Sequence, residues 1–421
     1  MEEEFEEKVD AFYALMYQLC QCRRSVVASL LKGDSVGEEL VTCLEKVKNK
    51  IIAGTKSDFV VTLTTDSGRA MRLNVRDELL GMEKDMFFTG CMKSGSNGSK
   101  VFVDCLARYH PKSVETFHEE VAFTEAMLKQ IMSLGLGIFI TDWDGTMKTY
   151  CSNYRTSVQP AYSAYWLAIF AKFCSSLCAV LTAGPLGDFG ILNLVAVPVE
   201  DANVIFGGSW GREWLIHNRR CVDRTAIPEN GEENLNKLTQ CLLKAINDRT
   251  DFHRFLMTGS GFQRKVDRLT IGLQTVSGEV TDQESKAFLD AVMEAVKTVD
   301  PDDTIFYVRH EKLDVEVVLK SVQGGWTKGD GFRFLLKETG RSLATEVVWI
   351  CGDTASDLPM LDLALKVNPK NTYATFVNPS DEVRSKIAAN MAPDHYTIVG
   401  CPEVLHAAME GIMREKGIRT I

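Results

Sequence analysis

Hydrophobic residues near the start of the chain recur at the spacing of two amphipathic helices. The two series are Phe5, Val9, Phe12, Met16 and Leu19, then Val36, Leu40, Leu44, Val47 and Ile51. Steps of three or four residues place each series on one helix face. Because Gly33, Asp34 and Ser35 separate the two series, residues 1–53 predict a helix pair.

Short β-rich runs follow the helix pair. Residues 59–65 (FVVTLTT) and 70–75 (AMRLNV) flank the turn-forming segment 66–69 (DSGR). This arrangement predicts a hairpin, with a third helix as the alternative. Residues 93–100 (KSGSNGSK) are polar and rich in glycine, so we expect an exposed loop there. A helix predicted from about residue 114 to 132 leads into the next strand.

From residue 137 onward, apolar runs alternate with amphipathic segments. The runs are 137–141 (GIFIT), 177–182 (LCAVLT), 347–351 (VVWIC) and 374–378 (ATFVN). Buried strands that alternate with helices predict a parallel sheet covered by helices on both faces. Between the second and third runs lie the segments 269–276, 282–299, 304–308 and 313–319, which predict an inserted α+β module.

Residues 162–184 form a long apolar stretch, close to the roughly 20 residues that a membrane span requires. Lys172 and the pair Ser175-Ser176 divide it into a helical part and a short β-rich run. A buried helix followed by a central strand explains this pattern, so we expect no membrane association.

The length and charge of the chain narrow its class. At 421 residues it exceeds a single domain of about 100–200 residues, so we expect two or three domains. Hydrophobic residues make up 45% and charged residues 25%, which is the balance of a globular protein. The formal net charge of -10 argues against nucleic-acid binding. The acidic start MEEEFEEKVD lacks the features of a secretory signal, so we expect a cytoplasmic location.

The 12 cysteines include no CxxC pair, and the chain has no HExxH motif. We therefore expect free, buried thiols in a reducing compartment. Cys20 and Cys22 lack a second cluster that would complete a tetrahedral zinc site, so no zinc is assigned to them.

Polar residues with catalytic potential follow three of the predicted strands. Asp142 and Asp144 follow the first strand, Thr182 ends the second, and Asp353 follows the third. Because the carboxyl ends of parallel strands share one edge of the sheet, these residues should lie together. A single acidic turn after a strand is common, but its recurrence at three strand ends indicates a functional site.

Lys328 and Asp357 complete this predicted site. Lys328 lies in the glycine-bracketed segment GGWTKGDG (324–331), from which a cation can approach a phosphate. Asp357 lies four residues after Asp353, where it can cap a helix or help to bind a metal. Carboxylates that converge on one point repel each other unless a hard cation lies among them. An oxygen-lined site suits Mg²⁺ together with a substrate phosphate, so we expect phosphoryl transfer.

Four motifs in this order resemble those of the haloacid dehalogenase superfamily of aspartate-nucleophile phosphatases. They are DWDGT (142–146), Thr182, Lys328 and GDTASD (352–357), and the resemblance covers roughly residues 137–409. The segments GSWGREW (208–214), GSGFQRKVDR (259–268) and LDVEVV (313–318) are similar to the trehalose-6-phosphate phosphatase family, in particular its longer, nematode-type members.

The resemblance implies an α/β fold with a Rossmann-like core, a parallel sheet, an inserted α+β cap of the C2 type and a mainly helical N-terminal region. The expected domains are a helical accessory region at 1–112, the first part of the core at 113–211, the cap at 212–320 and the second part of the core at 321–421.

The resemblance also implies a role for each residue of the site. Asp142 would attack phosphorus, and Asp144 would protonate the leaving oxygen and then deprotonate water. Thr182 and Lys328 would bind the phosphoryl oxygens. Mg²⁺ would be held by Asp142, the backbone carbonyl of Asp144 and Asp353, with Asp357 in support.

Family members contact the sugar through a Glu-x-Lys pair and a further glutamate on the cap. Gln263 and Lys265 occupy the first positions here, with glutamine in place of glutamate, and Glu316 matches the second. Strand parity places Glu316 opposite the apolar face of its strand. The same argument places Gln263 and Lys265 on the apolar face unless the strand is irregular. Arg212, near the expected hinge, is either a sugar contact or part of an ion-paired turn.

The expected function is Mg²⁺-dependent hydrolysis of trehalose 6-phosphate through an aspartyl-phosphate. The enzyme alternative is a phosphatase for another sugar phosphate, such as sucrose phosphate or glucosylglycerate phosphate. The alternative from another class is a non-catalytic regulatory or scaffold protein. Residues 1–112 are expected to be either a packing extension or a module for protein contacts or oligomerisation.

Overall fold

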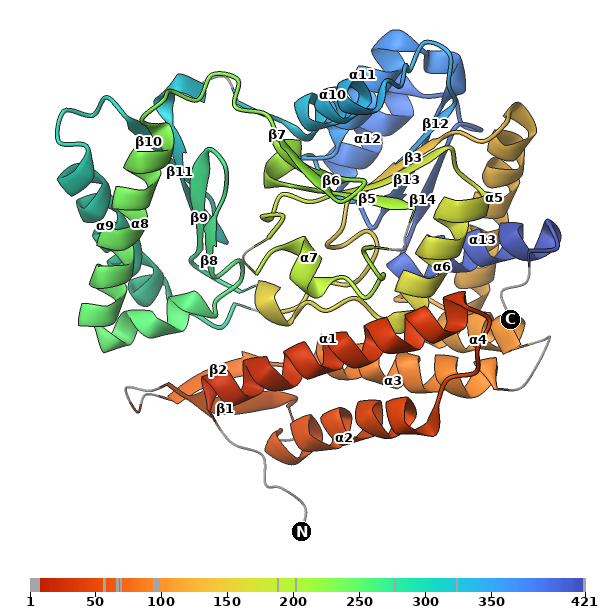
Figure 1. Ribbon diagram of the computed structural model, residues 1–421, viewed down its shortest axis with the longest axis horizontal. Coiled ribbons are helices and arrows are strands. Elements are labelled where there is room, and N and C mark those ends of the chain that lie inside the picture. Colours follow the sequence, from red (N-terminus) through yellow and green to blue (C-terminus); the bar gives the residue numbers. More distant parts are fainter. Residues whose placement is uncertain are drawn as a thin grey trace.

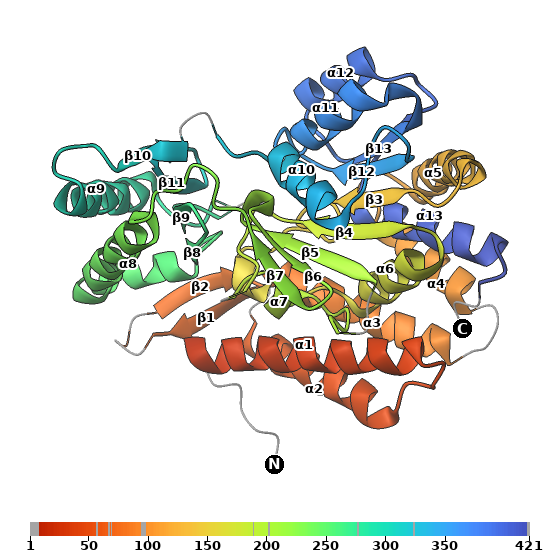
Figure 2. The same ribbon diagram turned by 45° about the horizontal axis from the view of Figure 1, so that its top comes forward.

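The computed structural model describes residues 8–55, 58–65, 68, 70–93, 98–187, 189–200, 203–275, 278–322 and 325–418. Its N-terminal part lies along one side of the molecule (Figures 1 and 2). The elements of this part are α1 (Val9–Leu31), α2 (Glu38–Gly54), β1 (Val60–Thr64), β2 (Ala70–Asn74), α3 (Arg76–Met92) and α4 (Gly98–Leu106). The predicted helix pair is confirmed for the described residues. The predicted hairpin is also confirmed, because β1 and β2 pair antiparallel.

The expected loop at 93–100 is only partly present. Residues 94–97 lie outside the described part of the chain, and α4 already begins at Gly98. Gly98 and Ser99 are buried, although polarity alone predicted exposure. A Cβ on Gly98 would lie 2.2 Å from the carbonyl oxygen of Cys91, so close packing against the end of α3 explains why glycine occurs here.

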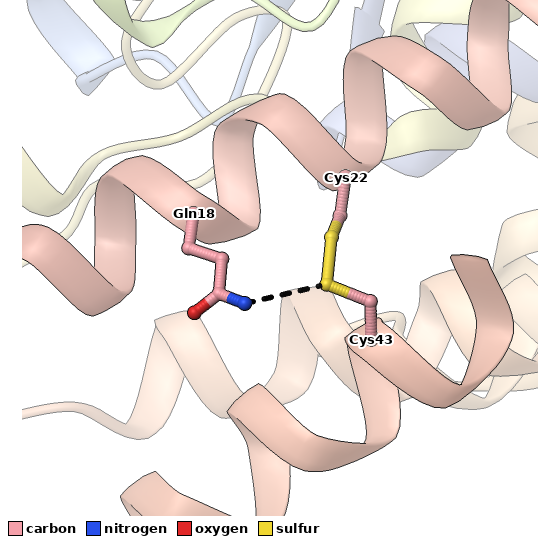
Figure 3. Close-up of a disulfide and its surroundings, with 3 residues drawn as sticks. All are labelled: Gln18, Cys22 and Cys43. Atoms are coloured by element: carbon pink, nitrogen blue, oxygen red, sulfur yellow. Dashed lines mark hydrogen bonds between the residues drawn. A yellow bond between two sulfur atoms is a disulfide. The ribbon is translucent and has the colours of Figure 1, made fainter. Parts of the chain in front are cut away.

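Cys22 of α1 and Cys43 of α2 form a disulfide, with 6.7 Å between their Cα atoms (Figure 3). The expectation of free thiols is therefore wrong for these two residues, while the other ten cysteines are free. The pairing depends on two helices packing side by side, which the sequence separation of 21 residues did not indicate.

The central sheet has eight strands in the order β14-β13-β12-β3-β4-β5-β6-β7. Its strands are β3 (Ile138–Thr141), β4 (Leu177–Leu181), β5 (Val204–Gly208), β6 (Glu213–Ile216), β7 (Arg219–Val222), β12 (Val348–Gly352), β13 (Thr372–Val377) and β14 (Tyr396–Val399). Pairing is parallel from β14 to β5 and antiparallel at β6 and β7. The predicted parallel sheet is confirmed.

Alternating side chains place the sheet between two layers of helices. On one face of the sheet, Phe139 packs in a hydrophobic cluster with α5 (Val114–Leu134), α6 (Ala161–Phe173) and α13 (Pro402–Glu415). The same cluster also joins the N-terminal helices to the core. Ile138 and Ile140 point to the other face, which α10 (Lys328–Thr339), α11 (Leu358–Val367) and α12 (Asp381–Asn390) cover. A strand buried on both faces needs apolar residues at every position, which explains its continuous hydrophobic run.

The long apolar stretch at 162–184 forms most of α6 and all of β4, as predicted, and α6 is buried on all sides from Ala161 to Ala171. Among the described residues, no helix combines the length and hydrophobicity that a membrane crossing requires.

The insertion has its own four-stranded antiparallel sheet in the order β10-β11-β9-β8. The elements of the insertion are α8 (Gly231–Asp248), β8 (Phe262–Arg264), β9 (Arg268–Gly272), α9 (Asp282–Val299), β10 (Phe306–His310) and β11 (Asp314–Leu319). The short helix α7 (Ile191–Leu194) belongs to the core instead. A separate hydrophobic cluster joins its helices to its sheet. The domain bounds stay predictions. Within the range 212–320 predicted for the cap, β6 and β7 extend the central sheet instead.

Candidate active site

Three neighbouring strands of the central sheet end in the polar residues that the sequence singles out. Asp142 follows β3, Thr182 follows β4 and Asp353 follows β12, and β3 lies between the other two. Lys328 begins α10, whose start is fixed by a capping box between Thr327 and Asp330. The Nζ atom of Lys328 contacts Asp142 Oδ1 and lies 2.6 Å from Asp357 Oδ1. The expected convergence at one sheet edge is therefore present.

Asp142, Asp353 and Asp357 each present a carboxylate oxygen, and these oxygens lie within 4.8 Å of one another. Asp357 is fully buried, and its Oδ2 atom accepts hydrogen bonds from the backbone N–H groups of Asp353 (3.0 Å) and Thr354 (3.1 Å). Asp353 Oδ2 accepts a hydrogen bond from the hydroxyl of Tyr150 at 2.9 Å. Within the described part of the chain, the buried Asp353 Oδ1 has no partner.

The charges of this cluster are not balanced. Burial raises the pKa of Asp142 to about 7, with Lys328 opposing the shift and Asp357 adding to it. Burial and the charges of Asp142 and Asp357 raise the pKa of Asp353 to about 9. Burial disfavours the cation of Lys328, but the two aspartates next to it raise its pKa overall. One lysine does not offset three carboxylates, so this donor set fits a hard divalent cation.

Gly145 allows the first motif to lie against Asp353. Its φ is +83°, and a Cβ there would lie 2.2 Å from Asp353 Oδ2. A larger residue would therefore both strain the backbone and displace the carboxylate.

Asp144 lies beside the cluster and is held separately. Lys148 Nζ lies 2.7 Å from its Oδ1 atom, and the Ser157 hydroxyl donates to the same oxygen at 3.1 Å. Because Asp144 is bound to different partners from Asp142, the two aspartates can have different chemical roles.

One cavity joins the strand ends to the inserted module. From the core it is lined by Asp142, Asp144, Thr182 and Lys328, and from the insertion by Gln263, Lys265, Thr270 and Glu316. The cavity thus brings seven of the residues predicted from sequence together: three that follow strands, Lys328 at the start of α10, and three from the cap. Asp353 and Asp357 do not line it.

Gln263, Lys265 and Thr270 reach this cavity from a hairpin formed by β8 and β9. Gln263 pairs with Thr270 across β8 and β9, and the backbone N–H of Lys265 donates to Arg268 O at 2.9 Å. Gln263 and Lys265 were expected to share a face with Leu269 only if the segment formed one regular strand, and the segment is not regular. The chain reverses between them, and the turn resets the alternation.

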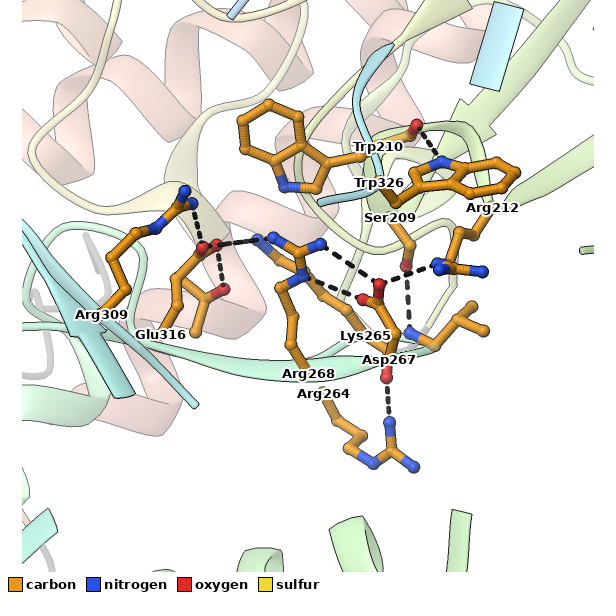
Figure 4. Close-up of polar contacts among 12 residues, drawn as sticks. Ser209, Trp210, Arg212, Arg264, Lys265, Asp267, Arg268, Arg309, Glu316 and Trp326 are labelled. Carbon is orange, nitrogen blue, oxygen red and sulfur yellow. Dashed lines mark hydrogen bonds and ion pairs between the residues drawn. The ribbon is translucent and has the colours of Figure 1, made fainter. Parts of the chain in front are cut away.

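Glu316 lies on β11, on the face opposite the apolar side chains, as predicted. It lies 3.2 Å from Arg268 and 3.9 Å from Lys265, it also contacts Arg309, and it accepts a hydrogen bond from Thr270 at 3.1 Å (Figure 4). Burial favours its neutral form, but these cations lower the pKa of Glu316 overall. It is therefore a carboxylate at neutral pH.

Arg212 is placed in an ion-paired turn, which was the alternative to sugar contact. Its Nε atom lies 2.7 Å from Asp267 Oδ2, and its guanidinium lies 4.2 Å from the centre of the Trp326 ring (Figure 4). Arg212 does not belong to the residues that line the cavity described above.

Sequence reasoning missed the segment between β3 and α6. Tyr150, Cys151, Tyr154 and Ser157 all line the cavity, yet they form no motif. A long connection that follows a predicted catalytic strand was the only signal available.

The fold and the site together define a phosphatase of the haloacid dehalogenase class, with a capped α/β core and acidic strand ends. A family model described as "Trehalose-6-phosphate phosphatase, C-terminal" matches residues 139–405. A second model, "Trehalose-6-phosphate phosphatase N-terminal helical bundle domain", matches residues 8–105.

Curated relatives agree with these models. A trehalose-phosphatase of Brugia malayi is 38% identical over 97% of this chain and 86% of its own length. One of Caenorhabditis briggsae is 35% identical over 97% of this chain and 98% of its own length. A solved C-terminal domain of the C. albicans trehalose-6-phosphate phosphatase has a TM-score of 0.47 at 12% identity, covering 68% of this chain and 96% of that chain. The chain belongs to the trehalose-6-phosphate phosphatase family, which confirms the family and the enzyme class predicted from the sequence.

Proposed function

We propose that this protein hydrolyses trehalose 6-phosphate to trehalose and phosphate with Mg²⁺, through an aspartyl-phosphate (an acyl phosphate) on Asp142. The observation that carries the proposal is the cavity that joins Asp142, Asp144 and Lys328 to the polar face of the cap. The relatives named trehalose-phosphatase support the choice of substrate.

In the first step, a carboxylate oxygen of Asp142 attacks phosphorus while the bond from phosphorus to the sugar oxygen breaks. Asp144 donates its proton to that oxygen, which leaves as the hydroxyl of trehalose. Thr182 donates a hydrogen bond to the phosphoryl oxygens, and the Lys328 cation offsets their charge.

In the second step, water attacks the phosphorus of the aspartyl-phosphate. Asp144 takes the proton of that water, and the carboxylate of Asp142 leaves as phosphate forms. Mg²⁺ bound by Asp142, Asp353 and the backbone carbonyl of Asp144, with Asp357 in support, would neutralise phosphate charge during both steps.

The cap supplies the sugar contacts in this proposal. Gln263, Lys265 and Glu316 offer donors and acceptors that hydroxyl groups can satisfy, and they line the same cavity as Asp144. A cap that closes over the site also excludes bulk water. Given its ion pair with Asp267, Arg212 is assigned to the core-to-cap junction rather than to the sugar.

A panel of phosphate esters tests the proposal. We expect kcat/KM to be highest for trehalose 6-phosphate, compared with glucose 6-phosphate, sucrose phosphate and glucosylglycerate phosphate. Asp142→Asn should lower kcat/KM by at least about a thousandfold because it removes the nucleophile. A preference for a monosaccharide phosphate would contradict the substrate, and an active Asp142→Asn variant would contradict the nucleophile. Absence of phosphate release from every ester would support the scaffold alternative.

A cytoplasmic location and a protein-contact role for residues 1–112 stay predictions.

A further inference from the structure

The segment 148–160 lies between the active-site cavity and the N-terminal region. One side of it supplies Tyr150, Tyr154 and Ser157 to the cavity. Its short 3₁₀ helix, Tyr154–Thr156, is capped by the side chain of Asn153, which accepts a hydrogen bond from the backbone N–H of Arg155 at 2.7 Å. The conformation of this segment therefore decides the shape of one cavity wall.

The other side of the segment is held by α1. Arg23 Nη1 donates to the carbonyl oxygen of Val158 at 2.9 Å. Tyr13, ten residues earlier on the same helix, accepts a hydrogen bond from Asn153 at 3.1 Å, and its ring lies 4.2 Å from the guanidinium of Arg155.

The helix α3 holds the segment as well. Asp85 accepts a hydrogen bond from the backbone N–H of Ala161 at 2.7 Å and pairs with Arg23 at 2.5 Å. Seven residues earlier, on the same helix face, Glu78 Oε1 accepts a hydrogen bond from the hydroxyl of Thr156 at 2.6 Å. Both carboxylates are buried, so these bonds form in an environment where hydrogen bonds to charged groups are strong.

These contacts continue to the catalytic acid. Ser157, next to Thr156, donates to Asp144 Oδ1 at 3.1 Å and contacts Lys148. Lys148 Nζ lies 2.7 Å from the same oxygen and donates to the carbonyl of Thr149 at 2.9 Å. Both side chains hold Oδ1, which leaves the other oxygen of Asp144 to carry the proton that the leaving group receives.

Glu78 acts on this arrangement in two ways. It fixes the hydroxyl of Thr156, and it lines a small cavity behind the site together with Lys148. Burial raises the pKa of Glu78 to about 7, so near neutral pH only part of the Glu78 population carries the charge that attracts the Lys148 ammonium. Some other buried contacts between the N-terminal helices and the core do not lead to Asp144. Lys84, also on α3 and also buried, pairs instead with Glu403 on α13 at 2.5 Å.

We propose that the N-terminal helical region is part of the catalytic apparatus, and that Glu78 is a positioning residue which holds the Thr156–Ser157 turn and, through Ser157 and Lys148, the carboxyl group of Asp144. This inference rests on the proposed role of Asp144 as proton donor. It assigns residues 8–105 a function in the phosphatase reaction itself.

Two substrates with different leaving groups test the inference in the full-length chain. Trehalose 6-phosphate releases an alkoxide that needs a proton, whereas p-nitrophenyl phosphate releases a stable anion that does not. The parameter kcat/KM reports the steps up to the first phosphoryl transfer, so its ratio for the two substrates measures protonation of the leaving group. Asp144→Asn serves as the reference, and Lys84→Met is the matched control for a buried contact of the same interface.

We expect Glu78→Ala to lower this ratio roughly tenfold, a fraction of the about 10²–10⁴-fold that general acid catalysis contributes. Thr156→Val, which removes only the hydroxyl and keeps the side-chain shape, should act in the same direction and covers a failure of Glu78→Ala to fold. Glu78→Gln keeps an acceptor for Thr156 and should retain most of the ratio. Lys84→Met should change stability without changing the ratio.

The inference is overturned if Asp144→Asn lowers the ratio while the Glu78 and Thr156 variants stay within about twofold of the parent. It is also overturned if Lys84→Met lowers the ratio as much as they do, because the effect would then be general destabilisation. A ratio that Asp144→Asn leaves unchanged would instead refute the proposed role of Asp144.

Discussion

Lys265 is a buried cation whose charge should control substrate binding. It is 4% exposed and lies 3.9 Å from Glu316 in the cap wall of the cavity. Burial lowers the pKa of Lys265 to about 8, and Glu316 opposes part of that shift. The cation is therefore present below about pH 8 and is lost as the pH rises above it.

The size of the effect follows from this pKa. At about pH 7 roughly nine tenths of the lysine is protonated, and at about pH 9 roughly one tenth is. If the cation donates hydrogen bonds to the substrate, kcat/KM should fall about tenfold between these values. The substrate phosphate, with its second pKa near 6, is a dianion throughout this interval and adds little to the change.

The assay is kcat/KM for trehalose 6-phosphate as a function of pH, for the parent and two variants. Lys265→Met should lower kcat/KM at neutral pH and lack the fall above pH 8. Lys265→Arg keeps a charge that does not titrate, so its profile should also lack the fall above pH 8. A fall of equal size and position in Lys265→Met would refute the assignment, because another group would then cause it.

Three further predictions concern stability and metal binding. Burial lowers the pKa of His406 to about 4, so His406 should contribute a loss of about 2 kcal/mol of unfolding free energy between about pH 7.5 and pH 5, where the unfolded chain takes up the proton. In denaturant titrations the parent should therefore lose about 2 kcal/mol more than His406→Gln over this interval, and an equal change in both proteins would contradict the assignment. Under non-reducing conditions, Cys22→Ser should lower the unfolding free energy by about 3 kcal/mol, since the disulfide closes a loop with a separation of 21 residues, and no change in the denaturation midpoint would contradict this. Removal of divalent cations should abolish turnover, and added Mg²⁺ should restore turnover and raise the melting temperature. Asp353→Asn should weaken the rise in melting temperature that Mg²⁺ causes. A full rise in the variant would place the ion elsewhere.

The core of the fold and the catalytic strand ends could be predicted from the sequence. A strand buried on both faces needs a continuous apolar run, and each such run is followed by the residue that reaches the sheet edge. The positions of Asp142, Thr182 and Asp353 were therefore fixed by local pattern together with the geometry of parallel sheets.

Features that depend on long-range packing could not be predicted in this way. The turn between Gln263 and Arg268 contains no Gly or Asn, so nothing in the sequence indicated that the chain reverses there. A single regular strand would have placed Gln263 and Lys265 on the apolar face. The disulfide required the relative placement of two helices. The bond from Thr156 to Glu78 joins residues 78 positions apart, and a single glutamate in a helix gives no signal of such a contact.

The central claim is that Asp142 becomes phosphorylated and that Asp144 is needed to release the phosphate. The most direct measurement is mass spectrometry of acid-quenched enzyme during turnover of trehalose 6-phosphate, with peptide mapping of the phosphorylated residue. The account predicts a phosphate on Asp142 and a higher phosphorylated fraction in Asp144→Asn at late times, because water attack then lacks its base. A phosphate on another residue, or an active enzyme that is never phosphorylated at Asp142 in either protein, would contradict it.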